Sequence, residues 1–358
     1  MRVVVGMSGG VDSAVSAYLL KQQGHDVLGV FMRNWDEKDE NGRCMADDDW
    51  QDVQHVCQVL EIPSYAADFT QEYKERVFAE FLRAYEAGLT PNPDVLCNRE
   101  IKFRAFLDFA GQLGAARMAT GHFVRLDPED RLLKGSDPTK DQSYFLYMLT
   151  KDQLSQSVFP VGHLRKAQVR AIAADVGIPV YDKKDSTGIC FIGERNFRQF
   201  LSHYLKPNPG MIRTDAGEVV GEHEGLMFYT IGQRKGMGIG GRGDGRSFFV
   251  ADKDVAQNEL IVVQGEDHPL LLSDTVFVDE LTWTHEPPGK EGATIPVLAK
   301  FRYRQPDQDV QLSIGENGTG VVICKKPQRA ITPGQSAVFY QGDVCLGGGI
   351  IRKSQRGS

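Results

Sequence analysis

The sequence lacks any apolar run near the ~18 residues that a membrane-spanning helix needs, so we expect no membrane partner. It also lacks the features of a secretory signal peptide, because Met1-Arg2 leads directly into Val3–Gly6, a segment typical of a buried strand. We therefore expect a cytoplasmic protein. Only six residues are cysteine and no C-x-x-C pair occurs, which argues against a disulfide scaffold, a zinc ribbon and an iron–sulfur cluster of the usual spacing.

The composition is that of an ordinary globular protein, with 41% hydrophobic and 25% charged residues, and it excludes collagen-like and disordered chains. Its 358 residues predict two or three domains. The net charge of −7 argues against a nucleic-acid partner only if the charge is evenly spread. Seven acidic residues crowd between Asp36 and Asp49, whereas ten Lys and Arg face six Asp and Glu from Leu281 onward. An acidic chain of this kind can still present a basic face.

Residues 1–205 alternate apolar strands with amphipathic helices, a pattern that predicts a doubly wound parallel sheet. Such sheets bind ligands beyond the carboxyl ends of their strands. We expect strands at Val3–Gly6, Asp26–Met32 and Ala115–Thr120, and helices at Ser13–Gln23, Trp50–Leu60, Thr70–Tyr85, Asn98–Leu113 and Gln168–Val176.

The pattern changes near Pro207, where short strands separated by turns begin. Residues 206–273 are expected to form a small middle domain with strands that include Glu218–Val220 and Leu226–Thr230. Regularly spaced strands and turn signals over residues 274–358 predict an antiparallel β-barrel.

A glycine- and serine-rich loop joins the first strand to the first helix and is suited to binding phosphate through its N–H groups. Its residues are Gly6, Met7, Ser8, Gly9, Gly10, Val11, Asp12 and Ser13. The lysine of a Walker A loop is absent, and the spacing is not the dinucleotide-binding G-x-G-x-x-G. Asp12 would make sense as a ligand of a Mg²⁺ ion that also binds the phosphates. The alternative is a glycine-rich turn that binds nothing.

The loop resembles the PP-loop of ATP pyrophosphatases, which implies that ATP is cleaved between its α- and β-phosphates and that a substrate oxygen is adenylated. The loop by itself leaves open whether nitrogen or sulfur then replaces that oxygen.

Two cysteines stand in polar contexts. Cys97 lies near the expected start of a helix that Asn92 caps, close to Arg99 and Lys102, and both features favour a thiolate. Cys190 follows the polar turn at Asp185–Gly188. For each, a buried structural cysteine is the alternative. Together with an ATP loop, a pair of thiols could carry sulfur and then exchange it.

Five motifs in order make a more specific resemblance, which covers essentially the whole chain. They are Gly6–Ser13, Asn92–Asn98 with its N-P-D triplet, Ala119–His122, Lys140–Tyr144 and Ser186–Cys190. The sequence resembles the bacterial-type tRNA-specific 2-thiouridylases, a family within the PP-loop superfamily with an adenine-nucleotide hydrolase-like fold.

The resemblance implies that ATP adenylates O2 of the tRNA wobble uridine and that a persulfide on Cys190 supplies the sulfur. Cys97 would be the second thiol, acting through a disulfide with Cys190 or through proton transfer. Asp94 would be a general acid or base, with Asn92 and Pro93 beside the target base. As an acid in the first turn of a helix, Asp94 could instead serve only the helix dipole. The implied nucleotide contacts outside the loop are Met32 on adenine and Gly121.

The resemblance also implies tRNA as partner and a persulfide donor supplied by a cysteine desulfurase relay. The implied tRNA contacts are His122, Lys140, Asp141, Gln142, Arg302, Tyr303 and Gln335. An exposed histidine and a solvated strand face are the alternatives for His122 and for Arg302–Arg304. The glycine-rich, basic Gly236–Gly245 stretch could order on RNA or be a plain loop.

Two other functions fit parts of the sequence. A PP-loop synthetase that makes an amide or guanidino group would use the ATP loop but not the cysteines. A tRNA-binding protein that uses nucleotide as a switch would bind both ligands without modifying the RNA.

Overall fold

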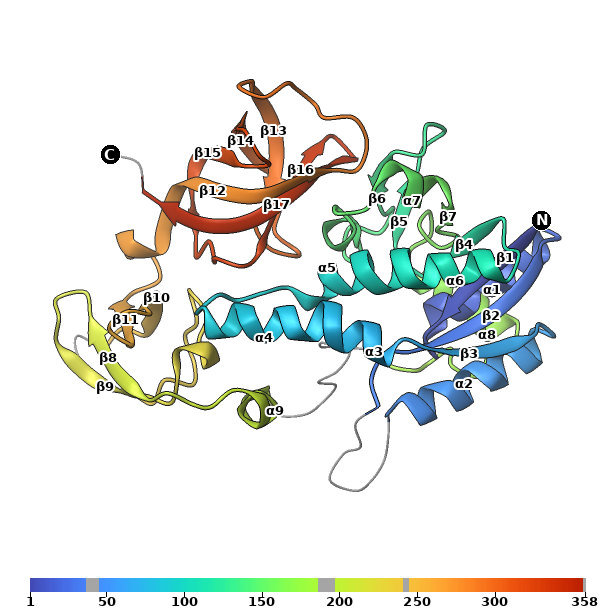
Figure 1. Ribbon diagram of the computed structural model, residues 1–358, viewed down its shortest axis with the longest axis horizontal. Coiled ribbons are helices and arrows are strands. Elements are labelled where there is room, and N and C mark those ends of the chain that lie inside the picture. The colour runs from blue at the N-terminus through green and yellow to red at the C-terminus, as the bar shows by residue number, and fades with distance from the viewer. Residues whose placement is uncertain (37–44, 186–196, 241–244, 357–358) are drawn as a thin grey trace.

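A computed structural model of the chain describes residues 1–36, 45–185, 197–240 and 245–356. An α/β part, a small middle part and a β-barrel follow one another along the chain (Figure 1). This arrangement confirms the expected fold class. No helix among the described residues is long and apolar enough to cross a membrane.

The α/β part is built on a parallel sheet with the strand order β3-β2-β1-β4-β7. Val3, Val4 and Val5 of the central strand are all fully buried, as expected for a sheet covered on both faces. The strands are β1 (Arg2–Met7), β2 (Asp26–Arg33), β3 (Ser64–Asp68), β4 (Arg117–Ala119) and β7 (Ser157–Val158).

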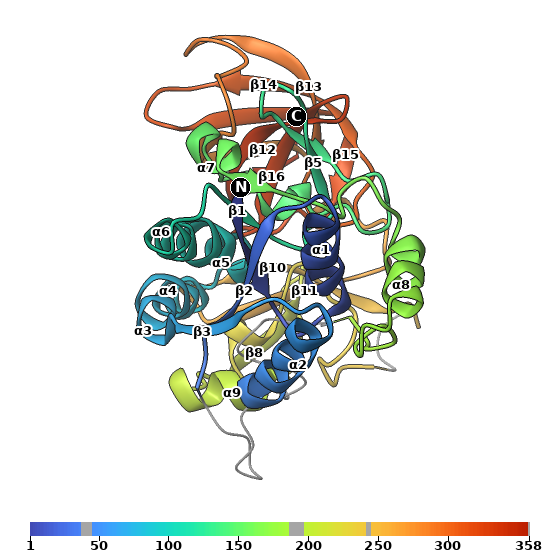
Figure 2. The same ribbon diagram turned by 90° about the vertical axis from the view of Figure 1, so that its right-hand side faces the viewer.

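Helices cover both faces, so the sheet is doubly wound. Val3 and Val5 pack with α1 (Val11–Gln22), α2 (Met45–Val59) and α8 (Lys166–Asp175). Val4 packs on the other face with two long helices. Figure 2 shows α1, α2 and α8 on one side of the sheet and these two helices on the other. One joins α3 (Thr70–Tyr73), η1 (Lys74–Phe78) and α4 (Ala79–Glu86), and the other joins α5 (Pro93–Cys97), η2 (Asn98–Ala105) and α6 (Phe106–Gln112).

The helix begins at Pro93, as the cap expected at Asn92 predicts, and it continues without a break into the segment expected to be helical from Asn98. Asn92 caps it, since its side-chain oxygen accepts a hydrogen bond from the Asp94 N–H at 3.2 Å, and proline suits the first helical position. The N-P-D triplet is therefore the start of the helix, and Cys97 lies in its second turn.

The middle part contains α9 (Phe197–Tyr204) and a sheet ordered β10-β11-β8-β9. These strands are β8 (Gly210–Thr214), β9 (Val219–His223), β10 (Phe248–Asp254) and β11 (Glu259–Gln264). The prediction of a strand at Leu226–Thr230 is wrong. The structure has a single helical turn there, η4 (Leu226–Phe228), whose three side chains are all buried rather than alternating, after Gly225 at a φ of 155°.

The barrel closes because its first strand pairs with its last, β12 with β17. In order around the barrel, the strands are β12 (Leu272–Trp283), β15 (Gly320–Arg329), β14 (Gln308–Ile314), β13 (Thr294–Lys300), β16 (Ser336–Gln341) and β17 (Val344–Gln355). The sequence did not indicate that β17 also pairs with β6 (Leu132–Lys134), which forms a hairpin with β5 (Val124–Leu126). The hairpin belongs to the α/β part, so the barrel sheet runs into it. The remaining short helices are η3 (Ser143–Phe145), α7 (Lys151–Ser155) and η5 (Pro269–Leu271).

Buried tyrosines fix the barrel to the α/β part. The Tyr144 hydroxyl donates to the Ser336 carbonyl at 2.9 Å, and the Ser336 hydroxyl donates to the Tyr147 oxygen at 3.1 Å. The hydroxyls of Ser143 and Tyr340 are 3.2 Å apart. Because all three tyrosines are at most 1% exposed, this contact is a packed interface and not a loose linker.

Candidate active site

The loop between β1 and α1 lies at the carboxyl end of the central strand, where a doubly wound sheet binds ligands. Ser13 tightens it, because its hydroxyl accepts from the Ser8 N–H at 3.2 Å and donates to the Gly10 carbonyl at 3.0 Å. Gly9 has a φ of +72°, and a Cβ there would lie 2.9 Å from the Asp49 carbonyl oxygen. The first N–H groups of α1 have no intrahelical acceptor and are available to an anion.

Gly121 approaches this loop from the end of β4. A Cβ at Gly121 would lie 2.7 Å from the Ser13 nitrogen and 2.8 Å from the Asp12 carbonyl carbon, so no other residue fits without a backbone shift. Met32 comes from the end of β2, and its methyl group would lie 3.1 Å from a Cβ at Gly6. The structure thus brings the loop, Gly121 and Met32 to one edge of the sheet.

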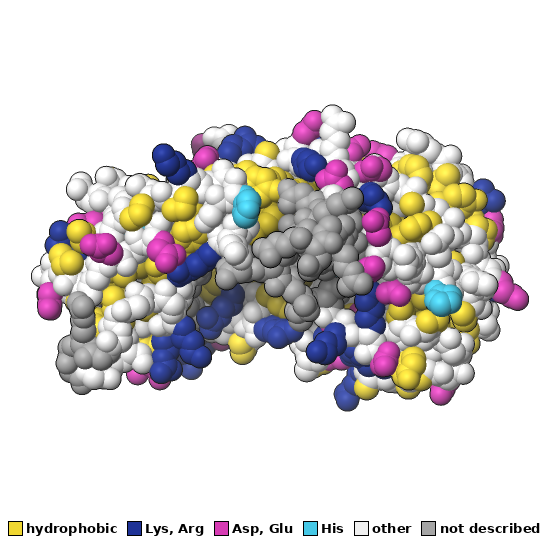
Figure 3. Space-filling model, turned by 90° about the horizontal axis from the view of Figure 1, so that it is seen from below, with side chains coloured by type: hydrophobic (Ala, Val, Ile, Leu, Met, Phe, Trp, Pro, Cys, Tyr) yellow, Lys and Arg dark blue, Asp and Glu magenta, His cyan; other side chains and the backbone are white. Residues whose placement is uncertain are grey.

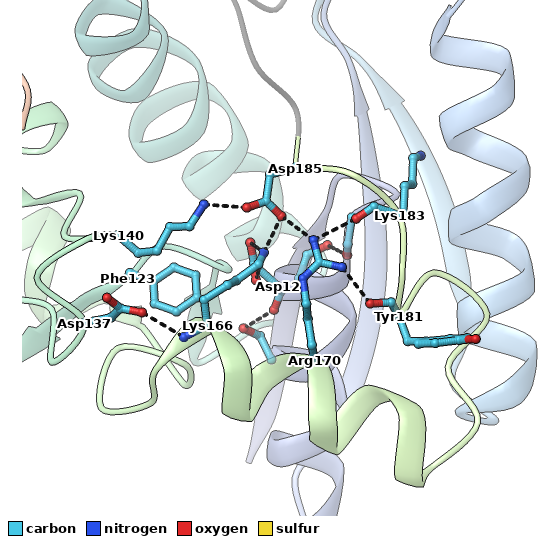
Figure 4. A network of polar contacts seen from close by, with 12 residues as sticks. Asp12, Phe123, Asp137, Lys140, Lys166, Arg170, Tyr181, Lys183 and Asp185 are labelled. Carbon is cyan, nitrogen blue, oxygen red and sulfur yellow. Dashed lines mark hydrogen bonds and ion pairs between the residues drawn. The ribbon is translucent and has the colours of Figure 1, made fainter.

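Charged side chains form a network beside the loop, drawn in Figure 4. Lys166 Nζ contacts both carboxylate oxygens of Asp12, at 2.7 and 2.8 Å, and Oδ1 of Asp185 at 2.6 Å. Asp185 also pairs with Lys140 and Arg170. Burial raises the pKa of Asp12, although Lys166 opposes this by hydrogen bonding to it.

A second lysine links the loop to α2. Lys183 Nζ donates to the Gly9 carbonyl at 3.2 Å and contacts Asp49 and Asp52 at 2.8 and 2.6 Å. Sequence reasoning missed Lys183, Lys166 and Arg170, because each occupies an unremarkable position near or within an amphipathic helix. Asp185 had one available signal, its place directly before the Ser186–Cys190 motif.

Asp94 lies in the first turn of α5, where burial raises its pKa and nearby Lys102 opposes the rise. A carboxyl group that is harder to ionise than usual can hold or release a proton near neutral pH more readily than an exposed one. Its place in the first helical turn and its raised pKa are the two properties of Asp94 that bear on the expected proton transfer.

Cys97 is 1% exposed and packs in the core of the α/β part. Cys190 lies outside the described residues. Burial raises the pKa of Cys57 to about 11 and that of Cys324 to about 12, and it raises the pKa of Cys345. These three thiols are therefore poor nucleophiles at neutral pH.

His122 is buried, whereas a surface contact with tRNA needs an exposed ring. Its Nδ1 lies 2.7 Å from the Thr120 hydroxyl, and its ring packs against Phe103 and Phe159. Burial lowers the pKa of His122 well below its ordinary value, so the ring is neutral. To contact His122, a tRNA base would have to leave the surface and reach this buried ring.

Of the three neighbouring candidates, one joins the charged network and two bind the local backbone. Lys140 points to Asp185. Asp141 is buried and accepts hydrogen bonds from the N–H groups of Gly135 and Ser143, both at 3.1 Å. The Gln142 side chain accepts from the Phe123 N–H at 2.9 Å. Asp141 and Gln142 therefore hold the local backbone in this structure.

Three candidates lie on the barrel. Arg302 is exposed in the turn after β13, and the Tyr303 ring centre is 4.5 Å from that of Phe145. The turn replaces the expected strand face, and Arg304 adopts a φ of +64° there. Gln335 Nε2 donates to the Thr90 carbonyl at 2.7 Å, just before the N-P-D helix, so this side chain connects the barrel to the site.

Among the residues that the structure describes, no group of three or more His, Cys, Asp or Glu side chains could hold a metal ion by itself. A metal bound at Asp12 would therefore have to share oxygens of the nucleotide, as Mg²⁺ commonly does.

Comparison with known proteins gives matches along the whole chain. Three family profiles match in succession: a tRNA methyl transferase HUP domain over residues 1–194, a tRNA methyl transferase PRC-barrel domain over 198–264, and an aminomethyltransferase β-barrel domain over 273–351. A solved 4-thiouridine synthetase–RNA complex with bound ATP is 15% identical, with a TM-score of 0.35, and covers 56% of this chain and 50% of its own. That likeness is too low to support an argument.

Full-length relatives are much more similar. The tRNA-specific 2-thiouridylase MnmA of Alkaliphilus oremlandii is 56% identical over 353 residues, which are 98% of this chain and 96% of that protein. The protein of the same name from Cupriavidus metallidurans is 55% identical over 357 residues, 98% of this chain and 99% of its own. With the five motifs in order along the sequence, and with a doubly wound sheet joined to a barrel in the part of the chain that the structure describes, the chain belongs to the tRNA-specific 2-thiouridylase family.

Proposed function

We propose that the protein is an ATP-dependent sulfurtransferase that converts the wobble uridine of tRNA to 2-thiouridine. The observation that carries the proposal is the 56% identity to a 2-thiouridylase over 98% of the chain. The PP-loop at the carboxyl end of β1 supports it, because adenylation needs a site for the departing pyrophosphate.

ATP enters at this loop, with adenine toward Met32 and the phosphates toward the start of α1. Uracil O2 attacks the α-phosphorus, the bond to the β-phosphate breaks, and pyrophosphate leaves. A Mg²⁺ ion shared by Asp12 and the phosphates fits the donor set and would neutralise phosphate charge. Lys166 now contacts both oxygens of Asp12, so the ion and the ammonium group would compete for that carboxylate.

Sulfur transfer follows on the adenylated base. The outer sulfur of a Cys190 persulfide attacks C2, and AMP leaves with the original oxygen. If the Cys97 thiolate then attacks Cys190, the sulfur–sulfur bond breaks, tRNA leaves with its new sulfur, and a Cys97–Cys190 disulfide remains for an external thiol to reduce. If Cys97 only transfers a proton, an external thiol must attack Cys190 instead: the sulfur–sulfur bond breaks, tRNA leaves with its new sulfur, and the disulfide forms between Cys190 and that thiol. Asp94 moves the proton beside the base.

Transfer RNA would lie across the α/β part and the barrel. Figure 3 shows the molecule from below, and Lys and Arg side chains gather along the middle of that face. Besides Lys140 and Arg302, the proposed contacts are His122, Asp141, Gln142, Tyr303 and Gln335. A persulfide donor fed by a cysteine desulfurase is the proposed sulfur source, and the reducing cytoplasm is the proposed location.

AMP release separates this function from a small-molecule synthetase. We expect AMP from ATP to appear only when tRNA with an unmodified wobble uridine is present. Full turnover with a small amine and no RNA would favour the synthetase.

Cysteine variants test the sulfur step. We expect Cys97→Ser and Cys190→Ser each to abolish thiolation while tRNA binding is retained, with Cys57→Ser as the matched control that keeps activity. Normal 2-thiouridine from either of the first two variants would remove that cysteine from the mechanism.

A further inference from the structure

Asp185 is a carboxylate surrounded by three cations at the edge of the phosphate loop (Figure 4). Its Oδ1 lies 2.6 Å from Lys166 Nζ and 3.0 Å from an Arg170 terminal nitrogen, and its Oδ2 pairs with Lys140. Burial opposes ionisation, but hydrogen bonds from Lys140 and Lys166 lower the pKa of Asp185 to about 2. The side chain is therefore an anion throughout the physiological pH range.

The cations are held where an incoming phosphate chain would meet them. Lys166 opens α8, and its N–H donates to Asp137 Oδ2 at 2.9 Å. Its Nζ bridges Asp185 to Asp12, which is part of the loop. Arg170 comes one turn later on α8 and also donates to the carbonyls of Tyr181 and Lys183, at 2.9 and 3.0 Å. Helix α8 carries Lys166 and Arg170, and contacts with Asp137 and with the carbonyls of Tyr181 and Lys183 hold these two residues in place from outside the phosphate loop.

The charges at this point are unbalanced. Among the described residues, the side-chain cations of Lys140, Lys166 and Arg170 form ion pairs with two carboxylates, Asp12 and Asp185, while the Asp137 carboxylate accepts from the Lys166 backbone N–H. A triphosphate offers more negative charge and more acceptor oxygens than one carboxylate, and guanidinium groups bind phosphate in a bidentate manner.

We propose that Lys166 and Arg170 bind the β- and γ-phosphates of ATP and the pyrophosphate that leaves, and that the Asp185 carboxylate competes with these phosphates for the same two cations. The inference rests on the proposed function for the identity of the nucleotide. As the bond between the α- and β-phosphates breaks, negative charge grows on the leaving oxygen, and the two cations stabilise it. As long as no Mg²⁺ ion takes its carboxylate, Asp12 acts as a positioning residue, since its two oxygens aim the Lys166 ammonium group at the loop.

The competition gives Asp185→Asn an unusual signature. The variant keeps the shape of the side chain but removes the competing charge, so we expect ATP and pyrophosphate to bind about fivefold more tightly. The same variant loses its ion pairs, so its Tm without nucleotide should fall. If Asp185 had only a structural role, the less stable Asp185→Asn variant would bind ATP and pyrophosphate more weakly than wild type or equally well.

Isothermal titration of the full chain with pyrophosphate, and separately with Mg·ATP, measures these affinities. Asp182→Asn is the matched control, because Asp182 is exposed on the same segment and its loss changes the net charge equally. We expect Arg170→Met to weaken both ligands about tenfold or more. Lys166 is 9% exposed and its replacement risks misfolding, so Arg170→Met, with a side chain about one-third exposed, carries the loss-of-binding test.

The results separate the two proposals. If wild type forms 2-thiouridine but Asp185→Asn binds pyrophosphate no more tightly than Asp182→Asn, the inference is wrong and the function stands. Unchanged binding by Arg170→Met would also overturn it. If wild type binds ATP and the variants behave as expected but no thiolated tRNA forms, the phosphate site stands and the function fails. If wild type binds neither ATP nor pyrophosphate, both are wrong.

Discussion

At the scale of single residues, the site depends on side chains whose burial changes their chemistry. Asp94 and His122 both lie within the electrostatic reach of Lys102. Burial makes the Asp94 carboxylate harder to form and the His122 imidazolium harder to form. Burial thus shifts the pKa values of both groups toward their neutral forms, the carboxylic acid of Asp94 and the neutral imidazole of His122.

Asp94→Asn tests this role. We expect thiolation to fall about 100-fold or more, because a positioned acid or base contributes roughly that much, while tRNA binding is retained. Asp108→Asn, an exposed position on the same long helix, should keep full activity. An Asp94→Asn enzyme with more than a tenth of wild-type activity would leave Asp94 with only a structural role at the helix start.

The same variant changes how stability depends on pH. Because the folded-state pKa of Asp94 is raised, its contribution to stability is present below the ordinary pKa and is lost as the pH rises through the raised value. The asparagine variant cannot ionise, so we expect it to lack this loss. Thermal unfolding of both proteins from pH 4 to 7 measures the difference. Parallel Tm curves would show that the Asp94 carboxyl group is not perturbed.

Much of the loop was predictable at this scale, and the cation network was not. The spacing of glycine, serine and aspartate within Gly6–Ser13 is by itself enough to predict a phosphate loop. Lys166 and Arg170 reach Asp12 and Asp185 only through the packing of α8 beside α1, and no local pattern encodes that contact. The burial of His122 likewise depends on Phe103 and Phe159, which are distant in sequence.

At the scale of elements, close backbone contacts hold the loop in place. Gly121→Ala would put a Cβ within 2.7–2.8 Å of the Ser13 and Asp12 backbone. We expect the displaced loop to bind ATP about tenfold or more weakly, and equilibrium titration measures this.

Gly111→Ala is the control for that change, because a Cβ on α6 at this position meets nothing within 4 Å. It should leave ATP binding unchanged and stabilise the helix by about 0.5–1 kcal/mol. Equal ATP affinity in the two alanine variants would mean that Gly121 does not shape the site.

A lysine connects the middle sheet to the end of α4. Lys253 Nζ donates to the Gly88 carbonyl at 3.0 Å, and burial lowers the pKa of Lys253 to about 8. Between this value and the ordinary pKa of 10.5, the unfolded chain holds more protons at this site than the folded chain, so stability should rise with pH across this window.

Comparison with Lys253→Met isolates this contribution. We expect wild type to gain on the order of 2 kcal/mol of unfolding free energy relative to the variant as the pH rises from 8 to 10. Denaturant unfolding at several pH values measures the gain. A constant difference between the two proteins would show that Lys253 titrates normally.

Element prediction from sequence succeeded where periodicity was strong and failed where it was short. The alternation of buried strands and helices predicts the doubly wound sheet, and regular turn signals predict the barrel. Leu226–Thr230 looked like a strand because its residues are apolar, but Gly225 turns the chain and all three η4 side chains enter the core. The β5–β6 hairpin was missed because its strands are only three residues long.

At the scale of the whole molecule, the barrel and the α/β part form a continuous body that one tRNA can contact in two places. The β5–β6 hairpin extends the barrel sheet, and Gln335 reaches the Thr90 carbonyl before the N-P-D helix. In the proposed complex, a tRNA in contact with the barrel would therefore be held at a fixed position relative to the N-P-D helix.

Arg302→Ala tests the contact on the barrel side. We expect weaker tRNA binding and a slope of log K against log salt that is smaller by about 1, because one phosphate contact releases one counterion. Lys290→Ala is the matched control, since Lys290 precedes β13 and Arg302 follows it, at opposite ends of that strand. An unchanged slope for Arg302→Ala would place Arg302 outside the interface.

The most direct test of the account is mass analysis of the nucleosides of tRNA after incubation with the protein, ATP, Mg²⁺ and a persulfide donor. The account predicts 2-thiouridine at the wobble position, with one AMP released for each sulfur incorporated and none formed without ATP. An unmodified uridine, or a nucleoside that has gained a methyl group in place of the exchange of oxygen for sulfur, would contradict it.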